Sequence, residues 1–354
     1  MVQMQELLTQ LVNRNGSDLH ISAGAPPKIR ISGSLVSTDH DIMTPEETKA
    51  LVYSILTTDQ IAGFEKKLEL DFSFGVRDLG RFRTNVFMQR GAVGAVLRVI
   101  PYRVLGFDEL GLPRKVCESL CNLPRGLILV TGATGSGKST TLAAMVDYIN
   151  DNRPCHIVTI EDPIEFLHGN KQALVNQREV GMDTHGFQNS LRSVLRQDPD
   201  VVLIGEMRDL ETIEAALLLS ETGHLTFGTL HTSDAVQTIN RIIDVFPHHQ
   251  QQQIRTQLSF SLQGVFCQQL LPTAIGKGRA LASEVLIVNT PVRALIRDDK
   301  AHQIYSIIQT SRKLGMATMN SSLAELALAN RITPEEAITR SSEPDELKRL
   351  LHRS

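Results

Sequence analysis

The residues best suited to chemistry lie between Gly126 and Met145. An apolar run, Leu127 to Thr131, precedes Gly132-Ala133-Thr134-Gly135-Ser136-Gly137-Lys138-Ser139, and an alanine-rich stretch follows. The run is typical of a parallel strand buried on both faces, and the stretch is typical of a helix. The sequence therefore contains a Gly-x-x-x-x-Gly-Lys-Ser loop in the strand–loop–helix setting that phosphate binding requires.

Each part of this loop has a physical task. The glycines let the backbone wrap a phosphate with its N–H groups turned inward, and the helix N-terminus adds partial positive charge. Lys138 supplies a mobile cation for the β- and γ-phosphates, and the Ser139 hydroxyl is a hard oxygen ligand for Mg²⁺. The predicted nucleotide-binding residues here are Thr134, Gly135, Ser136, Gly137, Lys138, Ser139 and Thr140.

Acidic residues follow two further apolar runs. Val201 to Ile204 leads to Glu206, where a nucleotide hydrolase needs a carboxylate to hold Mg²⁺ directly or through water. His156 to Ile160 leads to Glu161, Asp162 and Glu165, on the edge where parallel sheets bind ligands. One of these three acids could orient or deprotonate the attacking water, and a polar loop with a helix cap is the alternative.

Two histidines and two arginines complete the candidate set. His224 precedes and His231 follows the predicted strand Leu225 to Leu230. His231 falls at the C-terminal edge, where it could report a γ-phosphate, whereas His224 fits a structural role equally well. Arg81 and Arg83 share the outer face of an N-terminal strand. They form either a solvated face or cations donated across an interface to a phosphate.

The elements around these residues indicate an α/β protein with several parts. Capping signals at Thr44 and Thr57 start helices, and Leu70 to Val76 alternates as a half-buried strand, so residues 1–100 are predicted as a small α+β domain. Proline and glycine mark 101–113 as a linker. Strands at 127–131, 156–160, 201–204, 225–230 and 285–288, with helical stripes such as 254–262 between them, predict a mostly parallel P-loop domain over 114–290. Residues 291–354 are predicted as a helical subdomain.

Composition excludes several other classes. The chain has 354 residues, with 42% hydrophobic and 21% charged residues, as in an ordinary globular protein. A net charge of −3 gives no support to nucleic-acid binding. Cys117, Cys121, Cys155 and Cys267 form no C-x-x-C pair, so free thiols in a reducing cytosol are expected. We expect neither a signal peptide nor a membrane span.

Four motifs in order carry a resemblance: GATGSGKST, TIEDPIEF, VVLIGEMRDLET and TGHLTFGTLHT. They resemble the Walker A, Asp-box, Walker B and His-box of the secretion-type, or type IV filament, ATPase superfamily, and GSDLHISAG and GRFRTN extend the resemblance to the N-terminus. Residues 293–297 are similar to the AIRNLIRE signature of its pilus retraction ATPases, from which Pro291, Val292, Ala294 and Asp298 depart. We expect neither the tetracysteine insert nor the additional N-terminal domain that the assembly and type II secretion ATPases usually carry.

The resemblance implies a RecA-like ATPase domain, a PAS-like N-terminal domain and a cytoplasmic homohexamer that uses ATP and Mg²⁺. Glu165 would be the catalytic base, Glu206 the Walker B acid acting on Mg²⁺ with Ser139, and His231 the γ-phosphate sensor. Arg81 and Arg83 would act on a neighbour's nucleotide, and Glu161, Asp162 and His224 would help to bind it. Residues 101–113 would be the hinge.

The implied function is a motor that powers type IV pilus retraction and twitching motility, docked on a PilC-like platform protein at the inner-membrane base of the pilus. Three alternatives stay open. The same enzyme could serve pilus assembly or type II secretion, or the chain could form a nucleotide-gated structural or regulatory ring with little turnover. A RecA-like DNA motor is the third, and the acidic composition speaks against it.

Overall fold

The computed structural model describes residues 2–31, 33–77, 79–100, 103–276 and 278–352 and divides into two compact units. The N-terminal unit comprises Met1–Arg103 and Glu165–Leu167, and the C-terminal unit comprises Val104–Ile164 and His168–Ser354. The division falls inside the predicted linker 101–113, whose first two residues lie outside the described ranges. The finer boundaries at 100, 113 and 290 stay predictions.

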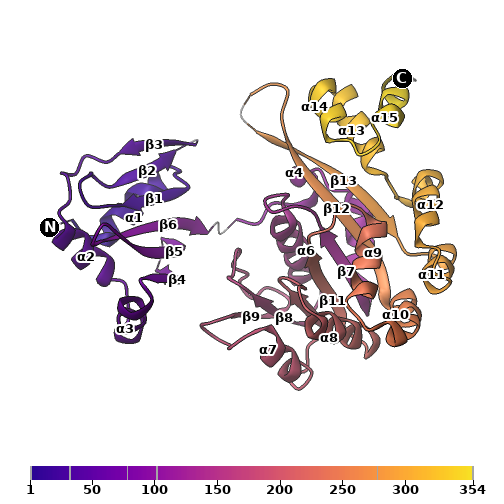
Figure 1. The fold of residues 1–354 in the computed structure, drawn as a ribbon, viewed down its shortest axis with the longest axis horizontal. Helices are drawn as coiled ribbons and strands as arrows, with labels where there is room; N and C mark the ends of the chain where they lie inside the picture. Colours follow the sequence, from indigo (N-terminus) through magenta and orange to yellow (C-terminus); the bar gives the residue numbers. More distant parts are fainter. Residues whose placement is uncertain (1, 32, 78, 101–102, 277, 353–354) are drawn as a thin grey trace. The chain divides into compact units, whose positions relative to one another are not determined.

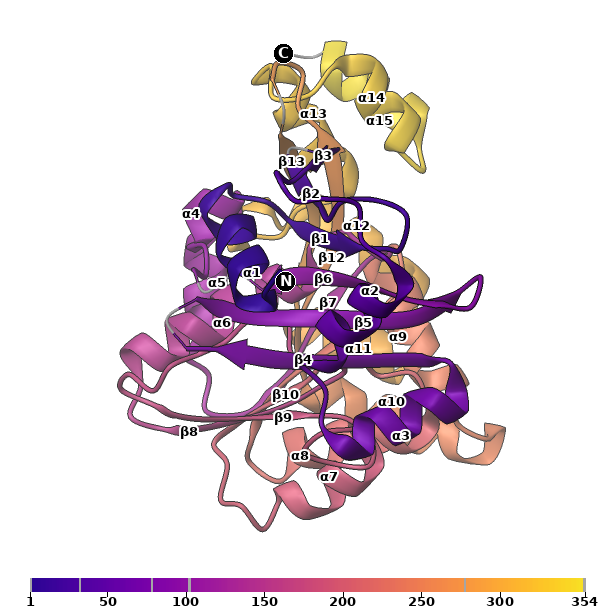
Figure 2. The ribbon, with the colours of Figure 1, turned by 90° about the vertical axis from the view of Figure 1, so that its left-hand side faces the viewer.

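The N-terminal unit is an antiparallel sheet with helices on one face. Its strands are β1 (Asp18–Ile21), β2 (Lys28–Ile31), β3 (Ser34–Ser37), β4 (Glu69–Val76), β5 (Gly80–Gln89) and β6 (Ala92–Ile100). They lie in the order β3-β2-β1-β6-β5-β4, which Figure 2 shows from top to bottom. The helices are α1 (Met4–Asn13), α2 (Pro45–Tyr53) and α3 (Thr58–Lys67). Capping boxes at Thr44 and Thr57 confirm the predicted starts of α2 and α3.

Successive side chains of β5 point to opposite faces of this sheet. Phe82, Thr84 and Val86 are fully buried, as predicted, because they face the core beneath α1 to α3. Arg83 on the other face is exposed. Arg81 lies on the same face as Arg83, as predicted, but it is half-buried and donates from Nη2 to the Ser73 hydroxyl at 2.5 Å.

The C-terminal unit is built on a seven-stranded sheet (Figure 1). Its strands are β7 (Gly126–Thr131), β8 (His156–Glu161), β9 (Leu174–Glu179), β10 (Val201–Ile204), β11 (Leu225–Leu230), β12 (Leu262–Pro272) and β13 (Arg279–Ile287). The order is β13-β12-β7-β11-β10-β8-β9, and only β13 pairs antiparallel. This confirms the predicted, mostly parallel P-loop sheet.

Two strands escaped the sequence analysis, and a third is longer than predicted. The helical stripe predicted over 254–262 ends at Ser261, because Leu262 turns to an extended backbone and begins β12. β9 has a mixed polar sequence, which is compatible with its position at the edge of the sheet. All but the last residue of the run predicted over 285–288 belongs to β13, which starts six residues earlier, at Arg279, and pairs along β12.

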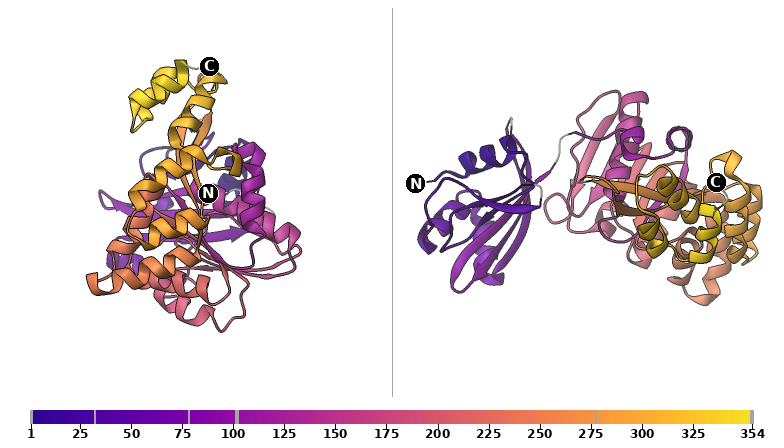
Figure 3. Two further views of the ribbon diagram at one scale, coloured as in Figure 1. Left: turned by 90° about the vertical axis from the view of Figure 1, so that its right-hand side faces the viewer. Right: turned by 90° about the horizontal axis from the view of Figure 1, so that it is seen from above.

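Helices cover both faces of this sheet and extend beyond its edge. They are α4 (Phe107–Leu110), α5 (Arg114–Cys121), α6 (Lys138–Asn152), α7 (Phe187–Val194), α8 (Leu210–Glu221), α9 (Ala235–Asp244), α10 (His248–Ser261), α11 (Thr290–Arg297), α12 (Ile304–Thr310), α13 (Met319–Leu328), α14 (Pro334–Arg340) and α15 (Pro344–His352), with short 3-10 turns at Ala301–Gln303 and Arg312–Leu314. In Figures 1 and 3 the yellow C-terminal helices gather beside the β12–β13 hairpin. α13 packs there through Leu323 and Ala324 against Leu271 and Ala282. Among the described helices, none has the length and apolar character needed to cross a membrane.

Asn150 at the end of α6 fastens the loop that leads from the acidic motif to β9. Its side chain donates to the carbonyl of Gly169 at 2.7 Å and accepts from the amide of Lys171 at 3.2 Å. Asn150 is fully buried, so its replacement by a leucine of similar size would leave both backbone groups without a partner.

We expect Asn150→Leu to lower the free energy of unfolding by about 1–3 kcal/mol, measured by urea denaturation. Asn152→Leu is the matched control, since Asn152 is exposed on the same helix, and it should change stability by less than about 0.5 kcal/mol. Equal effects of the two substitutions would contradict this role for Asn150.

Candidate active site

The strand order brings four sequence motifs to one edge of the parallel sheet. β7 ends at the glycine-rich loop, β11 at His231, β10 just before Glu206, and β8 at Glu161. These four strands are neighbours and run parallel, so their C-terminal ends lie side by side. Ligands bind at this edge in open parallel sheets, which makes it the candidate active site.

The glycine-rich loop has the backbone that a phosphate cradle needs. Gly135 and Gly137 have φ values of 79° and 92°, in the left-handed region that favours glycine. A Cβ at Gly132 would lie 2.4 Å from the carbonyl oxygen of Gln268. The Lys138 Nζ donates to the carbonyls of Gly132 and Ala133 at 2.8 and 3.0 Å, so the cation sits on the loop itself.

The first turn of α6 follows this loop directly. α6 begins at Lys138, and the N-cap residue Gly137 supplies no side-chain hydrogen bond to its amides. Ser139 and Thr140 are half-buried in the same turn. The helix therefore presents its N-terminal amides and two hydroxyls at the end where an anion is favoured.

Glu206 and His231 are brought together by the pairing of β10 with β11. The Glu206 Oε1 lies 3.0 Å from the His231 Nε2 and 2.5 Å from the Arg208 Nε. Partial burial by itself would raise the pKa of Glu206, but Arg208 and His231 outweigh it and hold that pKa below its usual value. The carboxylate is therefore ionised at neutral pH.

Arg208 is a residue that the sequence analysis missed. It lies two residues after Glu206 and is mostly exposed, with 78% of its side chain accessible. The negative charge of Asp162, which follows the end of the neighbouring strand, also raises the pKa of Arg208. The sequence did contain a signal for it, because Arg208 stands two residues after the acid that follows a predicted strand.

The acidic loop after β8 is held by buried polar contacts. Glu161 accepts from Thr159 Oγ1 at 2.6 Å and from Gln177 Nε2 at 3.1 Å, so it is fixed at the strand end. Glu179 at the end of β9 is buried and accepts from the amide of Ile164 at 3.1 Å. The sequence analysis missed Glu179, which anchors the residue just before Glu165.

Three predicted site residues lie in the N-terminal unit. Glu165 is exposed and belongs to the segment Glu165–Leu167 of that unit, and Arg81 and Arg83 lie on β5. The structure describes each unit by itself, so the roles of these three residues at a bound nucleotide stay predictions.

The structure places His224 away from the phosphate loop of its own subunit. It lies before the N-terminal end of β11, where its backbone carbonyl accepts from Gly126 and its Nδ1 lies 3.0 Å from the Leu219 carbonyl. A six-residue strand spans about 20 Å, so His224 and His231 lie at opposite edges of the sheet. His224 closes the turn between α8 and β11, which favours the structural alternative.

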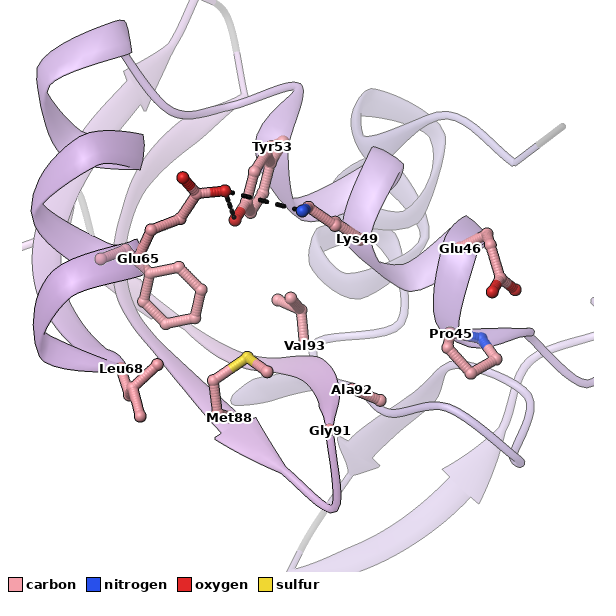
Figure 4. A pocket seen from close by; sticks show the side chains of 11 residues that line it. Pro45, Glu46, Lys49, Tyr53, Glu65, Leu68, Met88, Gly91, Ala92 and Val93 are labelled. Carbon is pink, nitrogen blue, oxygen red and sulfur yellow. Dashed lines mark hydrogen bonds and ion pairs between the residues drawn. The ribbon is translucent and has the colours of Figure 1, made fainter.

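A separate pocket of about 280 Å³ lies in the N-terminal unit and contains none of the predicted site residues (Figure 4). Its polar groups pair with one another: the Lys49 Nζ lies 3.6 Å from Glu65 Oε1, and the Tyr53 hydroxyl donates to the same oxygen at 3.2 Å. Met88 and Val93 line its apolar side. With its lysine already paired, this pocket has no group arranged for phosphate chemistry.

The fold and the site together define a P-loop ATPase. The chain belongs to the family described as Type II/IV secretion system protein, which matches residues 2–338.

Relatives match over nearly the full length. The Type IV pilus retractation ATPase PilT of Pseudomonas aeruginosa is 49% identical over 97% of this chain and 99% of its own. A twitching motility protein of Neisseria gonorrhoeae is 47% identical over 91% of this chain and 86% of its own. The crystal structure of the pilus retraction motor PilT with bound ADP superimposes with a TM-score of 0.93 at 51% identity, covering 99% of this chain and 100% of that one.

Arg208→Met should raise the pKa of Glu206, because it removes the strongest hydrogen bond and charge that stabilise the ionised carboxylate. A pH titration of the Glu206 carboxyl carbon by ¹³C NMR measures the change. Arg241→Met, which removes an exposed arginine from α9, is the control and should leave this pKa unchanged. An unaltered pKa of Glu206 in Arg208→Met would show that Arg208 does not stabilise the ionised Glu206 carboxylate.

Proposed function

We propose that this chain is the subunit of a hexameric ATP-hydrolysing motor that powers type IV pilus retraction and so supports twitching motility. The observation that carries the proposal is the juxtaposition of the phosphate loop with the Glu206–His231 pair at one sheet edge. This arrangement occurs in a chain that matches a pilus retraction ATPase over nearly its whole length.

The residues at the edge divide the work of hydrolysis. The loop amides from Thr134 to Thr140 hold the phosphates, with Lys138 neutralising the β- and γ-phosphate charge. We assign the role of γ-phosphate sensor to His231, whose Nε2 lies 3.0 Å from the Glu206 Oε1. Glu165 is proposed as the base that takes the proton of the attacking water, with Glu161 and Asp162 shaping the loop that carries it.

The donor set at this edge fits Mg²⁺. The Ser139 hydroxyl and the ionised Glu206 carboxylate are hard oxygen ligands, and Mg²⁺ keeps several waters beside such groups. Ser139 would bind the ion directly and Glu206 directly or through water. When bound, Mg²⁺ supplies charge neutralisation at the β- and γ-phosphates.

A second cation near the transferred phosphate is needed besides Lys138, and we assign it to Arg81 and Arg83 of a neighbouring subunit. Both arginines lie on β5, where Arg83 is exposed and the Arg81 guanidinium donates to the Ser73 hydroxyl. This division of one site between two subunits favours a closed ring, which we propose has six subunits. We place the ring on the cytoplasmic side, where ATP is available, against a platform protein at the inner-membrane base of the pilus.

Glu165→Gln should bind ATP with near-normal affinity yet hydrolyse it about 10²–10⁴-fold more slowly, because the amide cannot accept the proton of the attacking water. Steady-state ATPase assays and nucleotide titrations measure the two effects. Glu214→Gln, an exposed change on α8, should retain full turnover. Near-normal turnover of Glu165→Gln would remove Glu165 from the mechanism.

Deletion of the gene in its own bacterium should abolish retraction and leave excess surface pili, counted by electron microscopy. Cells without pili would instead identify an assembly motor, and loss of protein export would identify a type II secretion ATPase. A purified ring that binds ATP with negligible hydrolysis would identify a structural or regulatory ring. Restoration by the wild-type gene, and not by a Lys138→Ala variant, ties the phenotype to the phosphate loop.

A further inference from the structure

A buried carboxylate joins the starts of two helices beneath the candidate active site. Glu284 on β13 is 3% exposed, and its Oε1 accepts from the amide of Ala235, the first residue of α9, at 2.9 Å. The amide of Met319, the first residue of α13, also lies close enough to this carboxylate to lower its pKa. Both amides are N-terminal donors without a partner inside their own helix, and both helix dipoles favour an anion there.

The Ala235 contact lies four residues from His231. The connecting segment, residues 231–234, runs from the end of β11 to the start of α9 and has two further attachments. The Thr232 hydroxyl bonds that of Thr238 at 2.7 Å, and Asp234 caps α9 by accepting from the amide of Gln237 at 2.7 Å. Glu284 therefore holds the N-terminus of α9, to which the short segment 231–234 connects His231.

The Met319 contact attaches the same carboxylate to the C-terminal helices. The amide of Ser283 donates to the hydroxyl of Ser322 at 3.0 Å, and Val285 pairs with Ala317. The residues on both sides of Glu284 in β13 are therefore hydrogen-bonded to residues at or near the start of α13. A shift of α13 relative to α9 would break one of the two amide contacts.

We propose that Glu284 is a positioning residue for ATP hydrolysis, whose carboxylate clamps the N-termini of α9 and α13 and thereby sets the location of His231 beside Glu206. This inference rests on the sensor role proposed for His231. Glu284 itself contacts neither the phosphate loop nor the Glu206 carboxylate.

The ionisation of Glu284 controls this clamp. Burial is the main cause that raises its pKa to about 7, and the negative charge of Asp234 adds to it, against the two amides that lower it. The other titratable groups facing it are Cys267 on β12 and Tyr305 on α12, whose pKa values are themselves raised by burial and so leave both neutral. Below about pH 7 a protonated carboxyl places an O–H against one amide donor and loses that contact.

Glu284→Gln imitates the protonated form at every pH, because its NH₂ group also meets an amide donor. We expect its kcat to be about tenfold below that of the wild type at pH 8, with KM for ATP changed by less than about twofold. The ratio of the two kcat values should approach one as the pH falls below about 7, where the wild type loses the same contact. A constant ratio across the pH range would overturn the proposal.

A double-mutant cycle tests whether Glu284 acts through His231. If His231→Ala lowers turnover, adding Glu284→Gln to it should cause little further loss. Equal losses in both backgrounds would overturn the positioning role while leaving the proposed ATPase function intact. An undiminished turnover in His231→Ala would instead overturn the sensor role itself.

Two further variants separate positioning from general stability. Ala235→Pro removes only the amide that Glu284 holds, at a first helical position that tolerates proline, and should reproduce the kcat loss with Glu284 in place. Asn320→Ala weakens the packing of α13 on α15, where Asn320 bonds the Glu343 carbonyl and Glu346, without touching α9. It should leave kcat and the pH profile unchanged, and a loss equal to that of Glu284→Gln would count against the clamp.

Discussion

The parallel register of β7, β11, β10 and β8 is the constraint on which the rest of the structure depends. These strands are buried on both faces, so a slip of one residue would exchange their faces in a close-packed core and would displace the loop that follows each strand. The register aligns Ile204 with Ile160 and Gly228, and Leu230 with Thr131. Core packing therefore holds the phosphate loop, His231 and Glu206 at one edge.

Two carboxylates of the same residue type acquire opposite character within this frame. Glu206 is partly exposed and accepts from a guanidinium and an imidazole, so its pKa falls below the usual value. Glu284 is buried and faces the charge of Asp234, and these two causes raise its pKa to about 7 against the lowering effect of the Ala235 amide. The first is therefore a permanent anion suited to a metal ion, and the second is a group whose charge changes near neutrality.

The acids and the loop could be predicted because strand period, glycine spacing and residue chemistry are local properties. The point where α10 ends and β12 begins, at Leu262, could not be predicted. The change of backbone angles there depends on pairing with β7, which is distant in the sequence. His224 shows the same limit in reverse. Its motif left a nucleotide-binding role and a structural role open, and the strand length places it at the far edge of the sheet, next to the Leu219 carbonyl.

By itself the sequence determined the phosphate loop, the strand–helix alternation, the capped helix starts and the family to which the chain belongs, because each depends on residues close together in the chain. Only the tertiary structure decided that Arg208 and His231 share the Glu206 carboxylate and that Glu284 binds two helix ends. Arg208 lies only two residues from Glu206, but His231 comes from the end of the neighbouring strand, and Glu284 and Ala235 are 49 residues apart in the chain. Their meeting follows from the strand order of the sheet, which no local pattern encodes.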